Sequence, residues 1–426
     1  MFYTGIIMRM KLSAFGEKFT SKSGILELMD DLGKAVSGSE HVCMLGGGNP
    51  AQIDEVRDIW KGCLDSLTKD STKMEVSLSS YDSPQGNSSF IDALVEMFKR
   101  NYNWNITSEN IAITNGSQNA FFILFNLFSG TDSLGVKKKI LFPLCPEYIG
   151  YADQAIEEGV FKTVPATIHE EDELFFKYHA DFSRISIGDD IGAVCVSRPT
   201  NPTGNVLTDE EIRTLADMAE KAGVPFIIDN AYGSPFPGII FQDVTPLWNN
   251  NIILSMSLSK LGLPSVRTGI VVADKEIIKA VSACNAIVSL ANGNIGQIIT
   301  EPLFRSDEIL NISRNIIRPF YQKKSERAVS LLKETMSSHV DFRIHRSEGA
   351  IFLWIWFKNL SISSRELYER LKKRRVIVVP GEYFFFGLEE AWAHSTQCIR
   401  LNYAQDDALV EEGIRILAEE AEKVVL

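Results

Sequence analysis

A lysine that follows an apolar run is the first residue in this sequence with evident chemical potential. Lys260 stands in the run Ser257-Leu258-Ser259-Lys260-Leu261-Gly262-Leu263-Pro264-Ser265-Val266-Arg267. An amine flanked by hydroxyls and an arginine suits a cofactor that forms an imine and carries a phosphate, and pyridoxal phosphate is the candidate. Because the apolar run over 251–256 leads into it, we expect the lysine where a strand ends and a crevice opens. A surface lysine at a strand end is the alternative interpretation.

A turn between an apolar run and an apolar helix is the second candidate. Thr114-Asn115-Gly116-Ser117-Gln118 follows the predicted strand over 111–113 and opens a helix at Ala120. Free backbone N–H groups at such a helix start bind a phosphate, and Gly116 lets the backbone approach closely. Ser117 as a plain helix cap is the alternative.

Two further turns follow predicted strands and carry polar side chains. In Pro199-Thr200-Asn201-Pro202-Thr203-Gly204, the prolines fix the turn, so that the Asn201 amide can donate to a phenolate-like oxygen. In Asp229-Asn230-Ala231-Tyr232, a carboxylate at the end of a buried strand requires a partner, and a protonated pyridine nitrogen would be one. Tyr232 could donate to the same ring oxygen as Asn201. The alternatives are a rigid turn without chemistry, a helix-capping aspartate and a core tyrosine.

One arginine interrupts an otherwise apolar, alternating run. Arg400 lies in Cys398-Ile399-Arg400-Leu401-Asn402-Tyr403. A guanidinium that faces inward there suits the bidentate capture of a carboxylate and would hold an α-amino acid in one pose. An internal salt bridge is the alternative.

The elements that must position these residues alternate between strand-like and helical runs, which predicts an α/β fold with a largely parallel sheet covered by helices. Thr208-Asp209-Glu210-Glu211 is a capping box, and the helix that it starts should run to about Ala222. After about residue 308 the pattern changes to a long charged helix and an α+β segment. We expect a large domain over 61–310 and a small domain formed by 1–60 and 311–426. The predicted strands are Ile111–Thr114, Lys139–Pro143, Gly192–Ser197, Val224–Asp229, Asn251–Met256 and Thr268–Ala273.

The composition sets limits on the class of protein. The chain of 426 residues is 45% hydrophobic and 23% charged, as expected for globular domains with cores. A formal net charge of -12 disfavours nucleic-acid binding. The six cysteines are scattered without metal-ligand spacing and predict reduced, mostly buried thiols. With no secretory or membrane-spanning segment in the sequence, a cytoplasmic location is expected.

Together these runs resemble the class I and II aminotransferases, pyridoxal-phosphate enzymes of fold type I. The resemblance implies a mostly parallel seven-stranded sheet between helices in the large domain and a smaller α+β domain. It implies a homodimer in which Tyr81, in Tyr81-Asp82-Ser83-Pro84-Gln85-Gly86, reaches into the site of the other subunit. It also implies that Tyr148 stacks on the cofactor, with a core aromatic as the alternative. The residues that would hold the phosphate are Gly116, Ser117, Gln118, Ser257, Ser259 and Arg267.

A narrower resemblance covers nearly the whole chain from Phe15 onward. It is to members of this group that exchange an amino group between valine, or another small neutral amino acid, and pyruvate, giving 3-methyl-2-oxobutanoate and alanine. The runs at 45–52, 142–144, 148–151 and 235–241 carry it. It implies ping-pong kinetics through an imine on Lys260, which is both anchor and general base. Gly48 would place a backbone N–H near the substrate carboxylate, with a loop glycine without contact as the alternative.

Several features qualify the resemblance. The spacing from Lys260 to Arg267 is one residue shorter than in the common signature, so the phosphate contact of Arg267 is less secure. Residues 283–300 lack lysine and arginine, which favours a neutral substrate side chain, as do Phe15 and Ile25. Residues 1–9 precede the resemblance and are interpreted as an extension. A carbon-sulfur lyase of the same fold is the main alternative. A regulator with an N-terminal DNA-binding module is less favoured, because the resemblance starts almost at the first residue.

Overall fold

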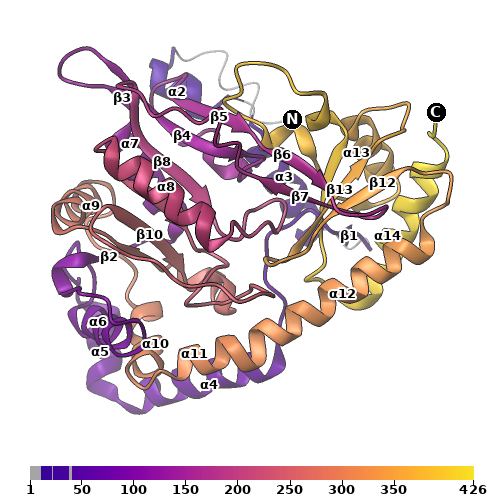
Figure 1. The fold of residues 1–426 in the computed structure, drawn as a ribbon. Coiled ribbons are helices and arrows are strands. Elements are labelled where there is room, and N and C mark those ends of the chain that lie inside the picture. The colour runs from indigo at the N-terminus through magenta and orange to yellow at the C-terminus, as the bar shows by residue number, and fades with distance from the viewer. Residues whose placement is uncertain (1–10, 22, 38–40) are drawn as a thin grey trace.

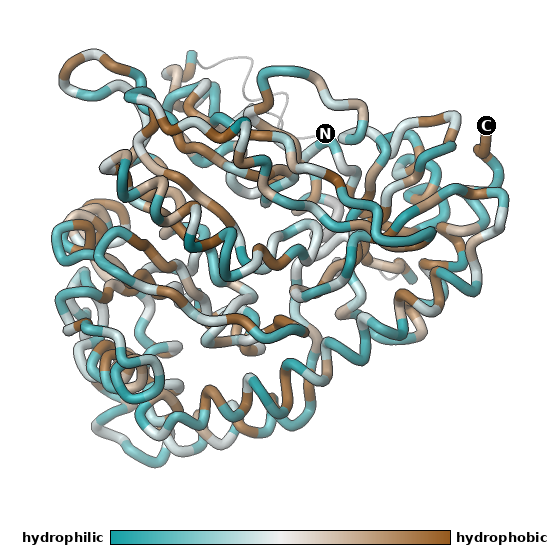
Figure 2. Tube along the Cα trace, viewed as in Figure 1, coloured by the Kyte–Doolittle hydropathy of each residue, from teal (hydrophilic) through white to brown (hydrophobic). Residues whose placement is uncertain are grey.

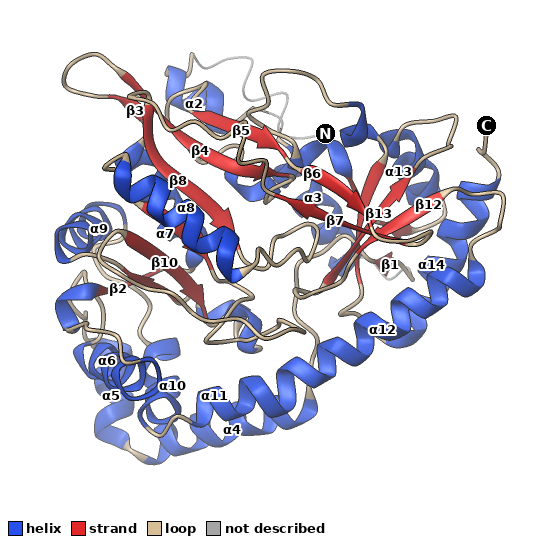
Figure 3. Cartoon of the chain, in the orientation of Figure 1, coloured by secondary structure: helices blue, strands red, loops and turns tan. Residues whose placement is uncertain are grey.

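The structure, a computed structural model, describes residues 11–21, 23–37 and 41–426. The interpretation of residues 1–9 as an extension falls outside the described residues. Two sheets dominate the described chain, and helices pack around both of them (Figures 1 and 3).

The larger sheet is mixed and mostly parallel, which confirms the predicted α/β fold. Parallel pairing joins β10 to β9, β9 to β8, β8 to β4 and β4 to β5, whereas β11 runs antiparallel to β10 and β2. The sheet has eight strands, not the expected seven, because the two-residue strand β3 pairs with the first residues of β4. The strands in spatial order are β2 (Ile111–Thr114), β11 (Gly269–Val272), β10 (Ile252–Ser257), β9 (Phe226–Asp229), β8 (Ile191–Ser197), β4 (Lys137–Cys145) and β3 (Gly130–Thr131), with β5 (Phe161–Pro165) beside β4.

Burial on both faces explains the continuous apolar character of the central strands. Every residue of β9 and β10 is buried, as expected for a parallel sheet covered by helices on both sides. The register places Ser197, Asp229 and Ser255 opposite one another on β8, β9 and β10. Polar groups from three neighbouring strands therefore meet at the carboxyl edge of the sheet.

Helices cover the large sheet and begin where the sequence places capping residues. The predicted helix after Thr208 is confirmed as α8 (Asp209–Lys221), with the Thr208 Oγ1 accepting from Glu211 N at 3.1 Å and Glu211 Oε2 accepting from Thr208 N at 2.8 Å. The other helices of this part are α4 (Asp54–Lys69), α5 (Ser71–Ser79), α6 (Ser88–Tyr102), α7 (Ser117–Phe128), α9 (Lys275–Val288) and α10 (Ile295–Arg305).

The second sheet combines strands from two distant parts of the chain. Strands β6 and β7 come from the middle of the sequence and join four C-terminal strands, although they lie inside the predicted range 61–310 of the large domain. The domain boundaries themselves stay a prediction. The spatial order is β15 (Val379–Pro380), β16 (Cys398–Asn402), β13 (Phe352–Phe357), β12 (Phe342–His345), β7 (Phe175–His179) and β6 (Thr167–Glu170).

A nearly continuous helical stretch runs along one side of the molecule from the large sheet to the second sheet (Figure 1). It consists of α11 (Glu308–Ile312), a π-helical turn (Ser313–Ile317) and α12 (Arg318–Thr335). Helices α13 (Ser364–Lys373) and α14 (Asp407–Glu422) complete the C-terminal part, where β1 (Cys43–Met44) pairs with β14 (Val376–Ile377). The N-terminal helices are α2 (Ala14–Phe19) and α3 (Gly24–Ser37).

Hydrophobic residues concentrate on the strands and on the inner faces of the helices (Figure 2). The six cysteines are free thiols, and four of them are buried. None of the described helices has the length and apolar character needed to span a membrane.

A buried ion pair ties the two sheets together. Lys177 on β7 donates to Glu348, to Asn205 Oδ1 at 3.0 Å and to the Val206 carbonyl at 3.1 Å. Glu348 Oε2 also accepts a hydrogen bond from Val206 N, at 2.8 Å. Both charges are buried and each is compensated, so the pair holds the loop after β8 against the second sheet.

We expect the single substitution Lys177→Met to lower the free energy of unfolding by about 3–5 kcal/mol, because it leaves the buried Glu348 carboxylate without a cation. Adding Glu348→Leu should recover part of this loss, because the uncompensated charge is then removed. Denaturant unfolding of the wild type and the two variants measures both changes. Equal stability of the single and double variants would contradict the proposed pairing.

Candidate active site

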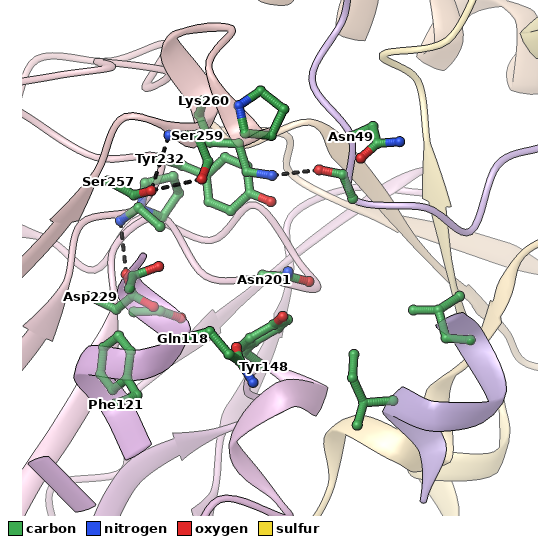
Figure 4. A pocket seen from close by; sticks show the side chains of 18 of the residues that line it. Asn49, Gln118, Phe121, Tyr148, Asn201, Asp229, Tyr232, Ser257, Ser259 and Lys260 are labelled. Atoms are coloured by element: carbon green, nitrogen blue, oxygen red, sulfur yellow. Dashed lines mark hydrogen bonds between the residues drawn. The ribbon is translucent and has the colours of Figure 1, made fainter. Parts of the chain in front are cut away.

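A cavity of about 290 Å³ lies at the carboxyl edge of the large sheet. Its walls come from the ends of three parallel strands, from the start of α7, from β16 of the second sheet and from α3 (Figure 4). Twelve residues singled out or mentioned from the sequence meet there: Ile25, Gly48, Ser117, Gln118, Tyr148, Asn201, Asp229, Tyr232, Ser257, Ser259, Lys260 and Arg267, together with Arg400 from β16.

Lys260 projects into this cavity from the short helical turn Ser259–Leu261, directly after β10. Its Nζ donates to the Gly48 carbonyl at 2.5 Å and lies 5.0 Å from the centroid of the Tyr232 ring (Figure 4). Burial lowers the pKa of Lys260 to about 7, and the positive charges of Arg400 and Arg267 add to this effect. A substantial fraction of the amine is therefore neutral near pH 7, as a nucleophile or general base requires.

Hydroxyls and backbone groups form an anion cradle beside Lys260. Ser257 Oγ donates to Ser259 Oγ at 2.9 Å, and Ser259 N donates to Ser257 Oγ at 3.1 Å. Opposite them, helix α7 begins at Ser117, where amide N–H groups lack intrahelical acceptors. Gln118, the next residue, also lines the cavity and donates to the Gly150 carbonyl at 3.2 Å.

Arg267 completes the cradle in spite of the short spacing from Lys260. It adopts a left-handed backbone conformation, with φ of 48°, and lines the cavity. A Cβ placed on Gly116, whose φ is 85°, would lie 2.1 Å from a guanidinium nitrogen of Arg267. The glycine is therefore required for the arginine to lie across the start of α7. Two serine hydroxyls, a helix N-terminus and a guanidinium form a donor set that fits a phosphate.

Asp229 lies at the end of β9 and is buried. Its Oδ2 accepts from the Tyr151 hydroxyl at 2.5 Å, and its Oδ1 accepts from Ala231 N at 2.8 Å. Burial raises the pKa of Asp229 to about 6, against the opposing effect of the Tyr151 hydrogen bond. No cationic side chain in the described chain forms an ion pair with this carboxylate. A protonated ring nitrogen would supply the missing charge.

Arg400 is buried in β16 on the opposite wall. Its terminal nitrogens donate to Asn201 Oδ1 at 2.7 Å and to the Gly46 carbonyl at 2.6 Å, and its Nε has no acceptor. The guanidinium carbon lies 4.1 Å from the centroid of the Phe352 ring. No described carboxylate pairs with Arg400, so the internal salt bridge considered from the sequence is not formed within the described chain. Burial lowers its pKa to about 10.

Asn201, Tyr232 and Tyr148 line the space between these two charges (Figure 4). Because Asn201 Oδ1 accepts from Arg400, its amide nitrogen is left to donate elsewhere. Burial raises the pKa of Tyr232 well above its usual value, which keeps the phenol protonated. A Cβ on Gly150 would lie 2.3 Å from the Tyr148 ring, so this glycine permits the ring to occupy its position.

Gly48, Tyr81 and Phe15, also singled out from the sequence, contribute no side chain to this cavity. Gly48 presents its carbonyl to Lys260, and a Cβ added to Gly48 would meet no atom within 4 Å. Tyr81 is 83% exposed and does not line the cavity. Phe15 stacks on Phe19 with ring centroids 4.5 Å apart and also lies outside the cavity, whereas Ile25 lines it.

Other lining residues escaped sequence reasoning. Ser197 could have been found, because it ends the strand that precedes the Asn201 turn. Glu147 directly precedes Tyr148, and Tyr151 lies three residues after it. Neither lines the cavity, and neither has a local pattern that points to its hydrogen-bond partner at a strand end, Ser197 or Asp229. The additional lining residues are Leu28, Met29, Asn49, Phe121, Ser197, Pro199, Ala231 and Pro264.

Comparison with known proteins agrees with this geometry. Residues 45–417 match the family described as aminotransferase class I and II. The chain belongs to this family of pyridoxal-phosphate-dependent enzymes and has their type I fold.

Individual relatives are similar over almost their whole length. The chain is 48% identical to the valine–pyruvate aminotransferase of Escherichia coli K12, over 97% of this chain and 99% of the relative. The crystal structure of valine-pyruvate aminotransferase from Salmonella typhimurium LT2 is 46% identical, covers 94% of this chain and 99% of its own, and superposes with a TM-score of 0.86. A putative amino-acid aminotransferase from Psychrobacter arcticum is 50% identical, with 97% and 99% coverage and a TM-score of 0.95.

The low pKa of Lys260 can be tested directly in the cofactor-free protein. Arg400→Met should raise the pKa of Lys260 above about 7, because it removes a neighbouring positive charge. Competitive labelling of lysines as a function of pH measures this value. Arg374→Met, which removes a half-buried arginine paired with Glu419 and Glu420 of α14, is the control and should leave it unchanged. An unaltered Lys260 titration in Arg400→Met would contradict the electrostatic coupling.

Proposed function

We propose that this protein transfers the amino group between valine, or another small neutral amino acid, and pyruvate. The observation that carries the proposal is a single cavity in which Lys260 lies between a buried carboxylate, Asp229, and a buried guanidinium, Arg400, neither of which has a counterion in the described chain. The 48% identity to the valine–pyruvate aminotransferase of Escherichia coli supports the substrate pair.

The residues of the cavity fit pyridoxal phosphate. Gly116, Ser117, Gln118, Ser257, Ser259 and Arg267 would hold the phosphate, Asp229 the ring nitrogen, Asn201 and Tyr232 the ring oxygen, and Tyr148 a face of the ring. When bound, the cofactor supplies an aldehyde carbon and an electron-accepting ring. The fit rests on the close approach of Arg267 to Gly116 at the start of α7 and on the buried Asp229 carboxylate, which has no cationic partner in the described chain.

The remaining chemistry belongs to side chains of this chain. Arg400 would bind the substrate carboxylate with two parallel donors, and this contact would orient Cα toward Lys260. The Lys260 amine would take the proton from Cα of the amino donor. In the second half of the reaction it would deliver a proton to Cα of the acceptor, and its lowered pKa favours both transfers. Asp229 would remain ionised when a protonated ring nitrogen binds to it, because a neighbouring cation lowers the pKa of a carboxyl group. The two keto acids would use the same site in turn, which predicts ping-pong kinetics.

The wall farthest from the strand ends favours a neutral substrate side chain. Ile25, Leu28 and Met29 of α3 contribute aliphatic surface to the cavity. The cations among the described lining residues are Lys260, Arg267 and Arg400, all of which already have roles in the proposed site. A distal carboxylate would therefore be desolvated without a partner, at a cost of several kcal/mol.

We expect kcat/KM for valine and alanine as amino donors to exceed that for aspartate by at least about a hundredfold, because the aspartate side chain would be buried unpaired. A coupled assay over a panel of donors, with pyruvate or 2-oxobutyrate as acceptor, measures this ratio. Lys260→Ala is the control and should abolish transamination and the cofactor absorbance of the lysine adduct. Turnover in Lys260→Ala, or aspartate as the best donor, would refute the proposal.

A homodimer would explain a cluster of exposed apolar side chains. Tyr81 is 83% exposed, Ile287 87% and Leu290 59%. Their segments lie together, because Asn285 Nδ2 at the end of α9 donates to the Pro84 carbonyl at 3.1 Å. An apolar surface of this kind supports contact with a second copy of the chain. In the proposed dimer, Tyr81 of each subunit would reach the phosphate site of the other.

Mixed dimers test this arrangement. Lys260→Ala and Tyr81→Ala chains, co-expressed with different tags, should assemble heterodimers that contain one intact site each. Random pairing predicts recovery of about a quarter of the wild-type activity at limiting cofactor, from two variants that are each impaired alone. Tagged pull-down confirms the mixed species. Failure of mixed dimers to regain activity would contradict a shared site, and a monomer in sedimentation analysis would contradict the dimer.

The cytoplasmic location stays a prediction, which the scattered free cysteines support.

A further inference from the structure

A second buried carboxyl group lies behind the cavity and has no role in the chemistry above. Glu147 lies two residues after the end of β4 and is 1% exposed. Its Oε1 accepts from Ser197 N at 2.9 Å, and its Oε2 accepts from Tyr148 N at 3.2 Å and lies 2.6 Å from Ser197 Oγ. Its own N–H donates to the Phe384 carbonyl at 2.9 Å. One carboxyl group thus connects the Tyr148 segment with the end of β8.

Both partners of Glu147 belong to the cavity. Tyr148 and Ser197 line it, and Ser197 is the register partner of Asp229 on the neighbouring strand. The turn that carries Asn201 begins directly after Ser197. Any shift of Glu147 would therefore change the relative positions of the ring-stacking tyrosine and of the strand ends that carry Asp229 and Asn201.

The surroundings of Glu147 oppose a negative charge. No lysine, arginine or histidine in the described chain forms an ion pair with it, in contrast to the buried Glu348, which pairs with Lys177. Among the described residues, the titratable groups that face it are acids: Asp229 on β9, Tyr148 and Tyr151 after β4, Cys195 on β8 and Cys145 on β4. Burial raises the pKa of Glu147 to about 8, and the charge of Asp229 adds to this, although hydrogen bonds from Ser197 and Tyr148 oppose it.

We propose that Glu147 is a positioning residue that, as a neutral acid, holds the Tyr148 segment against Ser197. Asp229 is then the one charged carboxylate among the described residues that line the cavity. The proposal rests on the proposed cofactor site, but not on which amino acid is the donor.

The protonation state of Glu147 decides which group donates in its 2.6 Å contact with Ser197 Oγ. A neutral Glu147 donates its O–H to Ser197 Oγ, and the Ser197 hydroxyl proton is then free to donate into the cavity that it lines. An ionised Glu147 accepts from the Ser197 hydroxyl instead, so that this donor is lost to the cavity. It also places a second negative charge beside Asp229. Both changes weaken the fit of the cavity to the cofactor.

Three variants of the full-length protein test the proposal. Glu147→Gln keeps the size and the neutral charge, and Glu147→Ala removes both hydrogen-bonded anchors. Glu420→Gln is the matched control, because Glu420 is a buried carboxylate on α14 that has cationic partners, Arg374 and Lys423, and does not line the cavity. The first readout is the dissociation constant of pyridoxal phosphate between pH 6.5 and 9.5, measured for each protein by absorbance titration. Ratios to the wild type cancel the titration of Lys260, which all four proteins share.

We expect Glu147→Gln to bind the cofactor as tightly as the wild type at pH 6.5 and about tenfold more tightly than the wild type at pH 9.5. Only the wild-type carboxyl group ionises over this range, and it can then no longer donate a hydrogen bond to Ser197 Oγ. Glu147→Ala should bind at least about tenfold more weakly than the wild type at pH 6.5. Glu420→Gln should keep the wild-type pH profile. A constant ratio of Glu147→Gln to wild type over the whole pH range, or equal weakening by Gln and Ala, would overturn the proposal.

Thermal unfolding of the cofactor-free proteins gives a second, independent readout. The unfolded Glu147 ionises near its usual pKa of about 4.5, whereas the folded group keeps its proton up to about pH 8. The wild type therefore loses stability relative to Glu147→Gln as pH rises from 5 to 8, and the Tm difference should grow over this interval. A Tm difference that does not change with pH would overturn the proposal that Glu147 is a neutral acid in the folded protein. Failure of the donor panel with these results intact would overturn the proposed substrate alone.

Discussion

Two buried charges on opposite walls of one cavity, Asp229 and Arg400, impose the main constraint on this structure. Desolvating a charged group without a counterion costs several kcal/mol, so each must be stabilised by its surroundings or by a ligand. The protein supplies part of this: Tyr151 and Ala231 N–H donate to Asp229, while Asn201 and the Gly46 carbonyl accept from Arg400. What remains is a need for a cation at Asp229 and for a carboxylate at Arg400. A protonated ring nitrogen and the carboxylate of an amino acid would meet these two needs in the proposed site.

Lys260 is governed by the same constraint. Burial lowers its pKa, and the charges of Arg400 and Arg267 add to this effect against the opposing charge of Asp229. Among the described lining residues, three cations thus stand against one carboxylate, although the chain as a whole carries a formal charge of -12. This contrast shows why net charge is informative about bulk partners such as nucleic acid, but not about a small anionic ligand. The anion cradle depends on the donor groups that surround it and not on the net charge of the chain.

The two sheets matter because each supplies one of the opposed charges. Asp229 ends β9 of the large sheet, and Arg400 lies in β16 of the second sheet. Contacts between the sheets fix their separation, among them the hydrogen bonds from the Lys177–Glu348 pair to Asn205 and Val206 after β8 and the bond from Arg400 to Asn201. Glu147 acts on a smaller scale, between the segment after β4 and the end of β8. Buried polar groups with few acceptable partners are well suited to this task, because a displaced partner leaves them unsatisfied.

The α/β class, the strand ends that carry Asn201, Asp229 and Lys260, and the capped helix after Thr208 follow from the sequence alone, because turn chemistry, capping and hydrophobic period depend on neighbours within a few residues. The packing of distant segments added that Tyr151 bonds Asp229 across 78 residues, that Glu147 is buried without a cation in the described chain, and that β6 and β7 join the second sheet. It also left Phe15 outside the cavity. Such contacts depend on how distant segments pack, and no local pattern encodes the path that brings them together.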